Sequence, residues 1–173
     1  MSAFDQAFEI VVGHEGGYTD NPRDRGNWDT GQIGQGKLKG TKYGISAMSY
    51  PTIDIAGLTL DGAREIYRRD YWDKIEGDSL DPGLALVVFD AAVNNGVGRA
   101  IRWLQEAVGA TADGVIGEAT RAAIRAADAT EALVGVHAAR IHFMASLPTW
   151  ATFGKGWSRR LAHLPHSAAN MEG

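Results

Sequence analysis

The sequence predicts a mainly α fold, in which one small β-hairpin lies between a first helix and a helical body. Two observations lead to this fold class. From Thr59 onward, apolar residues recur at the spacing of helices. Residues 18 to 44 are instead dense in glycine and short polar residues, which favour turns and short strands. With 173 residues, 45% of them apolar and 22% charged, the chain has the composition of a soluble globular protein.

The first helix is predicted from apolar residues at positions i, i+4, i+7 and i+8, namely Phe4, Phe8, Val11 and Val12. Ser2 or Asp5 is suited to cap its start. Two adjacent glycines stop a helix, so we expect Gly16-Gly17 to end it and to leave Glu15 at its C-terminus. In the segment that follows, the alternation in Gln32-Ile33-Gly34-Gln35 predicts a small twisted hairpin.

The helical body is predicted to begin with a helix that Thr59 caps. Asp81-Pro82 starts the next helix, which ends at Asn95-Gly96. Because this helix is apolar around nearly its whole circumference, it should be buried and central. Four more helices are predicted: one closed by Gly109, one beginning near Gly117 after a turn at Asp113-Gly114, a long one over residues 130–147 and a short one over residues 156–162.

Composition and motifs exclude several classes of protein. The chain has no cysteine, no His-Glu-x-x-His motif and no Asp-rich calcium loop, so we expect neither disulfide, metal nor cofactor. A net charge of −4 speaks against nucleic acid as a partner. The N-terminus lacks the pattern of a signal peptide, and the apolar runs are too short for membrane insertion. We therefore expect the chain to be made in the cytoplasm.

Glu15 and Asp24 are two carboxyl groups in different predicted environments. Glu15 follows an apolar helix and precedes a polar, glycine-rich segment, and burial against apolar groups raises the pKa of a carboxyl. Asp24 lies inside the loop region, where it should stay solvated and ionised. Glycoside hydrolysis uses such a pair, with one acid to protonate the leaving oxygen and a second group to stabilise the transition state or activate water.

Several motifs occur in order along the chain. They are His-Glu-Gly-Gly-Tyr at 14 to 18, Asn-Pro-Arg-Asp at 21 to 24, Thr-Lys-Tyr-Gly-Ile-Ser at 41 to 46, and Phe89-Asp90 with Asn94 and Gly96. Together they resemble glycoside hydrolase family 108. The second half, with Asp113-Gly114 and Phe153-Gly154-Lys155-Gly156-Trp157, resembles the peptidoglycan-binding segment that accompanies this family. The resemblance implies a lysozyme-like α+β fold and an N-acetylmuramidase of the kind found in phage and prophage endolysins. We expect a catalytic region over residues 1–94 and a helical peptidoglycan-binding region over residues 95–173.

The family's catalytic residues carry over onto this chain by motif. The catalytic acid is then Glu15, which an Asp matched by Asp24 and a Thr assist. Thr41 matches the Thr by motif, whereas Thr30 matches it by spacing, and we favour Thr41. Residues 27–40 look like an insertion relative to the family's pattern. Asp29, inside this insertion, is a weaker alternative for the second carboxylate.

Six residues are predicted to contact substrate: Tyr18, Trp28, Thr30, Tyr43, Asp90 and Asn94. Aromatic rings with a polar edge suit a saccharide surface, but packing within the protein explains these rings equally well. Asp90 and Asn94 share one face of the buried helix. They either contact substrate or form a structural hydrogen-bond network that holds the hairpin down.

The expected partner is peptidoglycan, and the expected reaction is hydrolysis of the β-1,4 bond between N-acetylmuramic acid and N-acetylglucosamine. Three other interpretations stay open: a lytic transglycosylase that closes an anhydro ring, a non-catalytic wall-binding module and a chitinase-type enzyme. We expect a monomer that a holin or a secretion machinery releases to the periplasm or cell wall.

Overall fold

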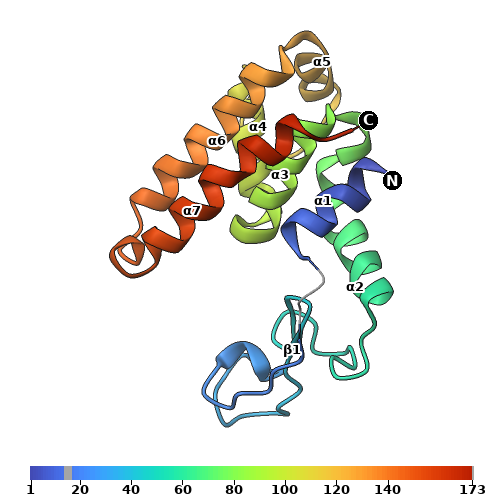
Figure 1. The fold of residues 1–173 in the computed structure, drawn as a ribbon, viewed down its shortest axis with the longest axis vertical. Helices are drawn as coiled ribbons and strands as arrows, with labels where there is room; N and C mark the ends of the chain where they lie inside the picture. Colours follow the sequence, from blue (N-terminus) through green and yellow to red (C-terminus); the bar gives the residue numbers. More distant parts are fainter. Residues whose placement is uncertain (14–16, 173) are drawn as a thin grey trace. The chain divides into compact units, whose positions relative to one another are not determined.

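The computed structural model describes residues 1–13 and 17–172, and its fold is mainly helical (Figure 1). The helices are α1 (Ala3–Val11), α2 (Leu60–Tyr67), α3 (Pro82–Asn95), α4 (Val97–Ala107), α5 (Glu118–Ala126), α6 (Ala129–Ala145) and α7 (Trp150–Ala169). The strands β1 (Thr41–Lys42) and β2 (Ile45–Ser46) form a two-stranded antiparallel sheet. The predicted mainly α fold with one small hairpin is therefore confirmed. None of the described helices combines the length and apolarity needed to cross a bilayer.

The chain divides into two compact units. Unit 1 comprises Met1–Ala7 and Arg68–Gly173, and unit 2 comprises Phe8–Tyr67. This spatial division differs from the functional division predicted after residue 94, which stays a prediction.

Ser2 and Asp5 cap the start of α1 reciprocally. The Asp5 N–H donates to Ser2 Oγ at 3.1 Å, and Ser2 Oγ donates to an Asp5 carboxylate oxygen at 2.7 Å. The helix stops at Val11, and Gly13 has a φ of +69° while its N–H still donates to a helix carbonyl. The prediction that Gly16-Gly17 ends this helix is wrong, because an earlier glycine closes it.

The hairpin of unit 2 turns at Tyr43 and Gly44. Both residues have positive φ, 50° and 74°, as a tight two-residue hairpin turn requires. Gly44 also has no room for a side chain, since a Cβ there would lie 2.5 Å from the Tyr67 hydroxyl oxygen. The turn is thus specified by a close approach of α2 as well as by backbone conformation.

Residues 28–38 form a loop and not a hairpin. An isolated antiparallel bridge pairs Trp28 with Leu38. Between them, the chain turns through three glycines with positive φ: Gly31, Gly34 and Gly36. The predicted strands around residues 32–35 are wrong, because these glycines favour turns over extended backbone.

Thr59 caps α2, as predicted: its Oγ1 accepts a hydrogen bond from the N–H of Gly62 at 3.1 Å. The buried face of the helix includes Tyr67, whose ring packs edge-on against Phe8 with a centroid distance of 5.6 Å. The Tyr67 hydroxyl donates to the Tyr43 carbonyl at 3.0 Å, which joins the helix to the hairpin tip.

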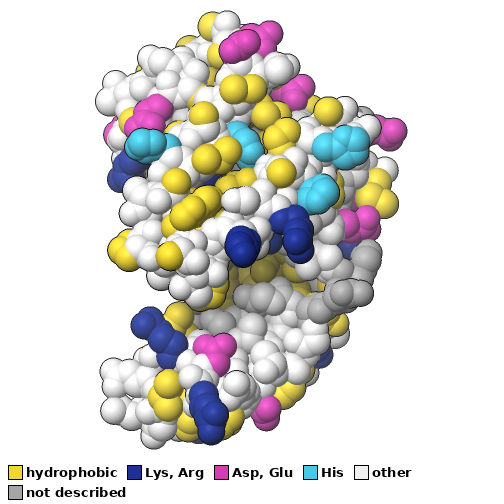
Figure 2. All heavy atoms as spheres, turned by 60° about the vertical axis from the view of Figure 1, so that its left-hand side comes forward, with side chains coloured by type: hydrophobic (Ala, Val, Ile, Leu, Met, Phe, Trp, Pro, Cys, Tyr) yellow, Lys and Arg dark blue, Asp and Glu magenta, His cyan; other side chains and the backbone are white. Residues whose placement is uncertain are grey.

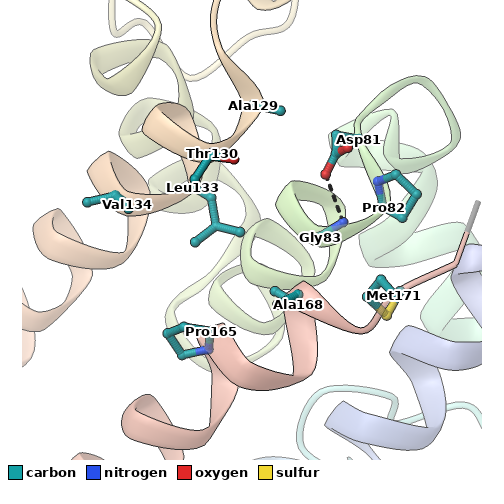
Figure 3. Close-up of a pocket in the computed structure, with 11 residues that line it drawn as sticks. Asp81, Pro82, Gly83, Ala129, Thr130, Leu133, Val134, Pro165, Ala168 and Met171 are labelled. Carbon is teal, nitrogen blue, oxygen red and sulfur yellow. Dashed lines mark hydrogen bonds between the residues drawn. The ribbon is translucent and has the colours of Figure 1, made fainter.

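Helix α3 is the central helix of unit 1, as predicted. Asp81 caps it by accepting from the Gly83 N–H at 3.0 Å, and Pro82 occupies the first helical position (Figure 3). Every residue from Gly83 to Ala92 is buried, and the helix packs against α4, α6 and α7. A Cβ at Gly83 would lie 2.8 Å from the Ala168 carbonyl oxygen, so the end of α7 approaches α3 closely at this glycine.

The three helices that follow α3, namely α4, α5 and α6, lie where they were predicted. Gly96 and Gly109 have positive φ where α3 and α4 end, and Gly114 has positive φ in the turn before α5. Helix α6, predicted over residues 130–147, spans Ala129–Ala145.

Helix α7 is much longer than the short helix predicted over residues 156–162, so that prediction is wrong. It spans Trp150–Ala169 and contains Pro165. A proline inside a helix leaves the carbonyl four residues before it without its usual donor. Here that carbonyl belongs to Leu161, and His137 of α6 lines the same pocket as Leu161.

Candidate functional site

The predicted catalytic acid, Glu15, lies outside the described residues. The other predicted site residues divide between the two units. Unit 2 contains Tyr18, Asp24, Trp28, Thr30, Thr41 and Tyr43, whereas unit 1 contains Asp90 and Asn94.

Asp24 is solvent-exposed, as predicted, and caps a short 3₁₀ helix (Arg25–Asn27). Its Oδ1 accepts a hydrogen bond from the Gly26 N–H at 2.8 Å. Within the described ranges, no hydrogen bond engages Oδ2. One oxygen therefore fixes the carboxylate, and the other is left to hold a water or to face a developing positive charge.

Asn27 links Asp24 to Thr41. It is fully buried, its N–H donates to the Asp24 carbonyl at 3.2 Å, and its Oδ1 accepts from Thr41 Oγ1 at 2.7 Å. Its Nδ2 donates to the Asn21 carbonyl at 3.1 Å. Because Thr41 gives its proton to Asn27, its oxygen keeps lone pairs for a donor such as water. The sequence did not point to Asn27, since an asparagine in a loop usually indicates a turn.

Thr30 and Asp29, the alternatives to Thr41 and Asp24, hold the loop of residues 28–38 together. The Thr30 hydroxyl donates to a loop carbonyl at 2.7 Å and accepts from a loop N–H at 3.3 Å. One Asp29 oxygen accepts from the Lys37 N–H at 2.8 Å, and the other lies 3.8 Å from Lys39 Nζ.

The indole of Trp28 also has a structural contact. It is half-buried, and its Nε1–H donates to the Pro22 carbonyl at 3.0 Å. Of the two roles left open for this ring, packing within unit 2 is the one that these contacts describe. A role in stacking on a sugar stays a prediction.

Tyr18 is the most open of the predicted aromatic contacts. It is 43% exposed and lines a groove of about 410 Å³ in unit 2, together with Leu38, Lys39 and Ile55. Tyr43, by contrast, forms the hairpin tip, where Lys42 Nζ lies 5.5 Å from its ring centre. Asp54 also lines the groove beside Tyr18, so its lining combines apolar, cationic and anionic side chains.

Asp90 belongs to a buried network in unit 1. It is 1% exposed and forms ion pairs with Arg140 of α6 and Arg160 of α7, whose Nε donates to Asp90 Oδ1 at 3.0 Å. Asn94 Nδ2 donates to the Asp90 carbonyl at 2.8 Å. Of the two alternatives for Asp90, the structure shows the hydrogen-bond network. The network connects three helices of unit 1, and a contact with substrate stays a prediction.

The predicted turn at Asp113 is organised by a buried glutamine. Gln105 Nε2 donates to Asp113 Oδ1 at 2.8 Å and to Thr120 Oγ1 at 3.1 Å, and its Oε1 accepts from the Gly114 N–H at 2.8 Å. The hydrogen bond from Gln105, followed by that from the Val115 N–H, holds the pKa of Asp113 below its ordinary value. These contacts describe a structural connection between α4 and α5.

His137 of α6 is half-buried. Burial is the main cause that lowers its pKa, and the charge of Arg140 adds to it. Its Nδ1 is buried without a hydrogen-bond partner. In the part of the chain that the structure describes, no group of three or more His, Cys, Asp or Glu side chains is placed to hold a metal ion.

Comparisons with known proteins give two family matches. The model of the family described as Glycosyl hydrolase 108 matches residues 8–96, and the model described as Predicted Peptidoglycan domain matches residues 99–162. Among solved structures, the chain is similar to that of Brucella abortus SagA. The two are 34% identical over 97% of this chain and 94% of that one, with a TM-score of 0.79. No curated protein matches the sequence.

Proposed function

Since this chain belongs to the glycosyl hydrolase 108 family, we propose that Glu15 is its catalytic acid and that Asp24 and Thr41 assist it. The chain is a peptidoglycan hydrolase of the N-acetylmuramidase type, in which a lysozyme-like glycoside hydrolase domain is followed by a peptidoglycan-binding domain. The predictions of family, of fold class and of activity are confirmed in this form.

The proposal for Asp24 and Thr41 is carried by their connection through Asn27. Asp24 offers a carboxylate oxygen to solvent, while the Thr41 hydroxyl gives its proton to Asn27 at 2.7 Å and offers its lone pairs. A water that donates one proton to the Asp24 carboxylate and the other to the Thr41 oxygen keeps its own lone pairs free to attack the sugar carbon. In this mechanism Glu15 protonates the leaving oxygen, and Asp24 and Thr41 position the water or stabilise the cationic transition state.

The test is digestion of purified peptidoglycan by the full chain, with mass spectrometry of the fragments. We expect reducing-end N-acetylmuramic acid from the wild type and a rate lower by roughly 10²–10⁴ for Glu15→Gln. Equal rates for the two proteins would remove Glu15 from the mechanism. Anhydro ends would identify a lytic transglycosylase, cleavage of chitin oligomers a chitinase-type enzyme, and binding without turnover a wall-binding module.

The choice between the two threonines has a matched control. Thr41→Val removes the hydroxyl that contacts Asn27, whereas Thr30→Val removes a hydroxyl whose hydrogen bonds, among the described residues, are within the loop of residues 28–38. We expect Thr41→Val, like Asp24→Asn, to lower the rate at least tenfold and Thr30→Val to keep most of it. The opposite order would exchange the two threonines in the proposal.

We further propose an endolysin role, in which a monomeric chain made in the cytoplasm reaches the periplasm or cell wall through a holin. The supporting observation is the activity itself, since peptidoglycan lies outside the cytoplasm. The chain and a holin are expressed separately and together in a bacterial host, and lysis is expected only with both. Lysis by the chain alone would contradict the need for a holin. Persistent growth with both would instead favour release by a secretion machinery, and size-exclusion chromatography tests the monomer.

A further inference from the structure

A pocket of about 310 Å³ lies in unit 1, where the junction of α3 and α4 meets α6 and α7. Its lining includes Asn94 and Asn95 at the junction, Arg99 on α4, Phe143 on α6 and Trp157 on α7. Among the described residues that line it, none is acidic, although the chain as a whole carries a net charge of −4. Figure 2, which brings the side of α6 and α7 forward, shows Lys and Arg side chains close to hydrophobic side chains on this face.

Arg99 is held in place at this pocket without a carboxylate. Its guanidinium carbon lies 4.1 Å from the centre of the Phe143 ring, and its Nη1 donates to the Asn95 carbonyl at 3.1 Å. The Phe143 ring packs in turn against the buried Trp103, at a centroid distance of 5.6 Å. Within the described ranges, no carboxylate lies at ion-pair distance from Arg99. A pre-positioned guanidinium of this kind has donors left for a planar anion.

The buried acid Asp90 does not pair with Arg99. Its carboxylate is instead engaged by Arg140 and Arg160. Arg140 itself lines the pocket and also donates to Asn95 Oδ1 at 2.8 Å. The same asparagine therefore contacts both arginines, Arg140 through its side chain and Arg99 through its carbonyl. Asn95 thus positions two of the three arginines that line this electropositive pocket.

Aromatic rings extend from this pocket along α7. Trp157 lines the pocket, and its ring lies 5.8 Å from that of Phe153, which is 53% exposed, and 5.9 Å from that of Trp150. These residues, at i, i+3 and i+7, share one helix face. One exposed ring, that of Phe153, and two half-buried rings beside a cation match a ligand that presents an apolar sugar face and a carboxylate together.

We propose that this pocket binds a carboxylate of the peptide stem of peptidoglycan, with Arg99 as the anion-binding group and Trp157 as the apolar wall. Peptidoglycan combines sugar rings with peptides that carry free carboxylates, which matches both parts of the surface. The pocket residues lie at 94–160, largely within the segment that matches a peptidoglycan domain, residues 99–162. The inference rests on the proposed function and adds the part of the substrate that this region recognises.

Binding of defined ligands to the full chain carrying Glu15→Gln, which we expect to prevent turnover, tests the proposal. The ligands are a disaccharide-peptide of peptidoglycan, the same disaccharide without peptide, and the disaccharide-peptide with its carboxylates amidated. We expect the unmodified disaccharide-peptide to bind most tightly, and Arg99→Gln to weaken it about tenfold, a factor that corresponds to about 1.4 kcal/mol. The affinity should also fall as salt rises, and Arg99→Gln should reduce this dependence.

Arg102→Gln is the matched control. Arg102 lies on the same helix, is exposed, and donates to the Gly98 carbonyl at 3.4 Å, but it does not line the pocket. We expect it to bind all three ligands like the parent. The proposal would be overturned if Arg99→Gln and Arg102→Gln lost the same affinity for the disaccharide-peptide. It would also be overturned if Arg99→Gln lost as much affinity for the peptide-free disaccharide as for the disaccharide-peptide. Competition by inorganic phosphate at similar concentrations would reduce the pocket to a general anion site.

A parallel assay separates this proposal from the proposed function. Hydrolysis of peptide-free glycan strands by the unsubstituted chain reports on the muramidase activity alone. If the unsubstituted chain hydrolyses the glycan strands but Arg99→Gln binds the disaccharide-peptide as tightly as the parent, only the pocket assignment is overturned. Absence of hydrolysis together with Arg99-dependent binding of the disaccharide-peptide would overturn the catalytic proposal only.

Discussion

Replacing Asp90 by Asn should strongly destabilise unit 1. The Asp90 and Arg140 side chains are 2% and 1% exposed and form an ion pair between α3 and α6. The substitution keeps the shape of the side chain but removes its charge, so the Arg140 guanidinium stays buried with one counter-charge fewer. Breaking a buried pair in this way costs about 3–5 kcal/mol. For a chain of this size, that loss lowers Tm by roughly 6–20 °C.

Thermal and urea unfolding, followed by far-UV circular dichroism, measures this loss. Arg160→Gln is the control, because Arg160 binds the same carboxylate from a position that is 40% exposed and leaves the buried pair intact. We expect it to cost about 1 kcal/mol or less. The double variant Asp90→Leu/Arg140→Met should be more stable than Asp90→Asn alone, since it leaves no buried charge. A loss below about 1 kcal/mol for Asp90→Asn, or equal losses for Asp90→Asn and Arg160→Gln, would refute the reasoning.

Three further predictions concern single contacts. Tyr67→Phe removes the hydrogen bond to the Tyr43 carbonyl and should lower the free energy of unfolding by about 1 kcal/mol in urea titrations; no change would mean that water replaces the hydroxyl. Gly83→Ala should cost about 1–3 kcal/mol although alanine favours helices, because its Cβ would lie 2.8 Å from the Ala168 carbonyl oxygen; a gain in Tm would show that α7 moves aside easily. The lowered pKa of His137 means that its contribution to stability is present above its unfolded pKa of about 6.5 and is lost as pH falls through the folded value. His137 should titrate within roughly pH 7.5 to pH 5, so over this range the free energy of unfolding should fall less in His137→Gln than in the wild type. Equal dependence of the free energy of unfolding on pH in the two proteins would exclude His137 as the cause.

Local signals were sufficient where one residue determines a boundary. Asp81-Pro82 begins α3, Thr59 begins α2 and Gly96 ends α3, as predicted, because capping and left-handed backbone depend on the residue itself. The exposure of Asp24 could also be predicted, since a polar, glycine-rich loop rarely buries a carboxylate. The predicted end of α1 was wrong for a related reason. Gly13 and Gly17 can each end a helix, and the helix closed at the earlier one, Gly13.

The hairpin position and the partners of the site residues depended on tertiary structure. The turn at Tyr43 and Gly44 forms where the Tyr67 hydroxyl reaches the Tyr43 carbonyl, a contact between residues 24 positions apart. Asn27 joins Asp24 to Thr41, which lies 14 positions after Asn27, and nothing in the residues beside Asn27 indicates that link. Such contacts depend on where folded segments meet, which periodicity and propensity do not encode.

The sequence by itself determined the helical body, its central buried helix, the exposed carboxylate of Asp24 and the motifs that led to the family. Only the tertiary structure decided that α7 continues through Pro165, because Leu161, Leu164 and Ala168 are buried and the helix packs against α3 and α6. Only the tertiary structure decided that Asp90 is an ion-pair partner, because Arg140 and Arg160 lie 50 and 70 residues away along the chain. A buried polar group must find its partners wherever the fold brings them, and that requirement appears only when the helices are packed.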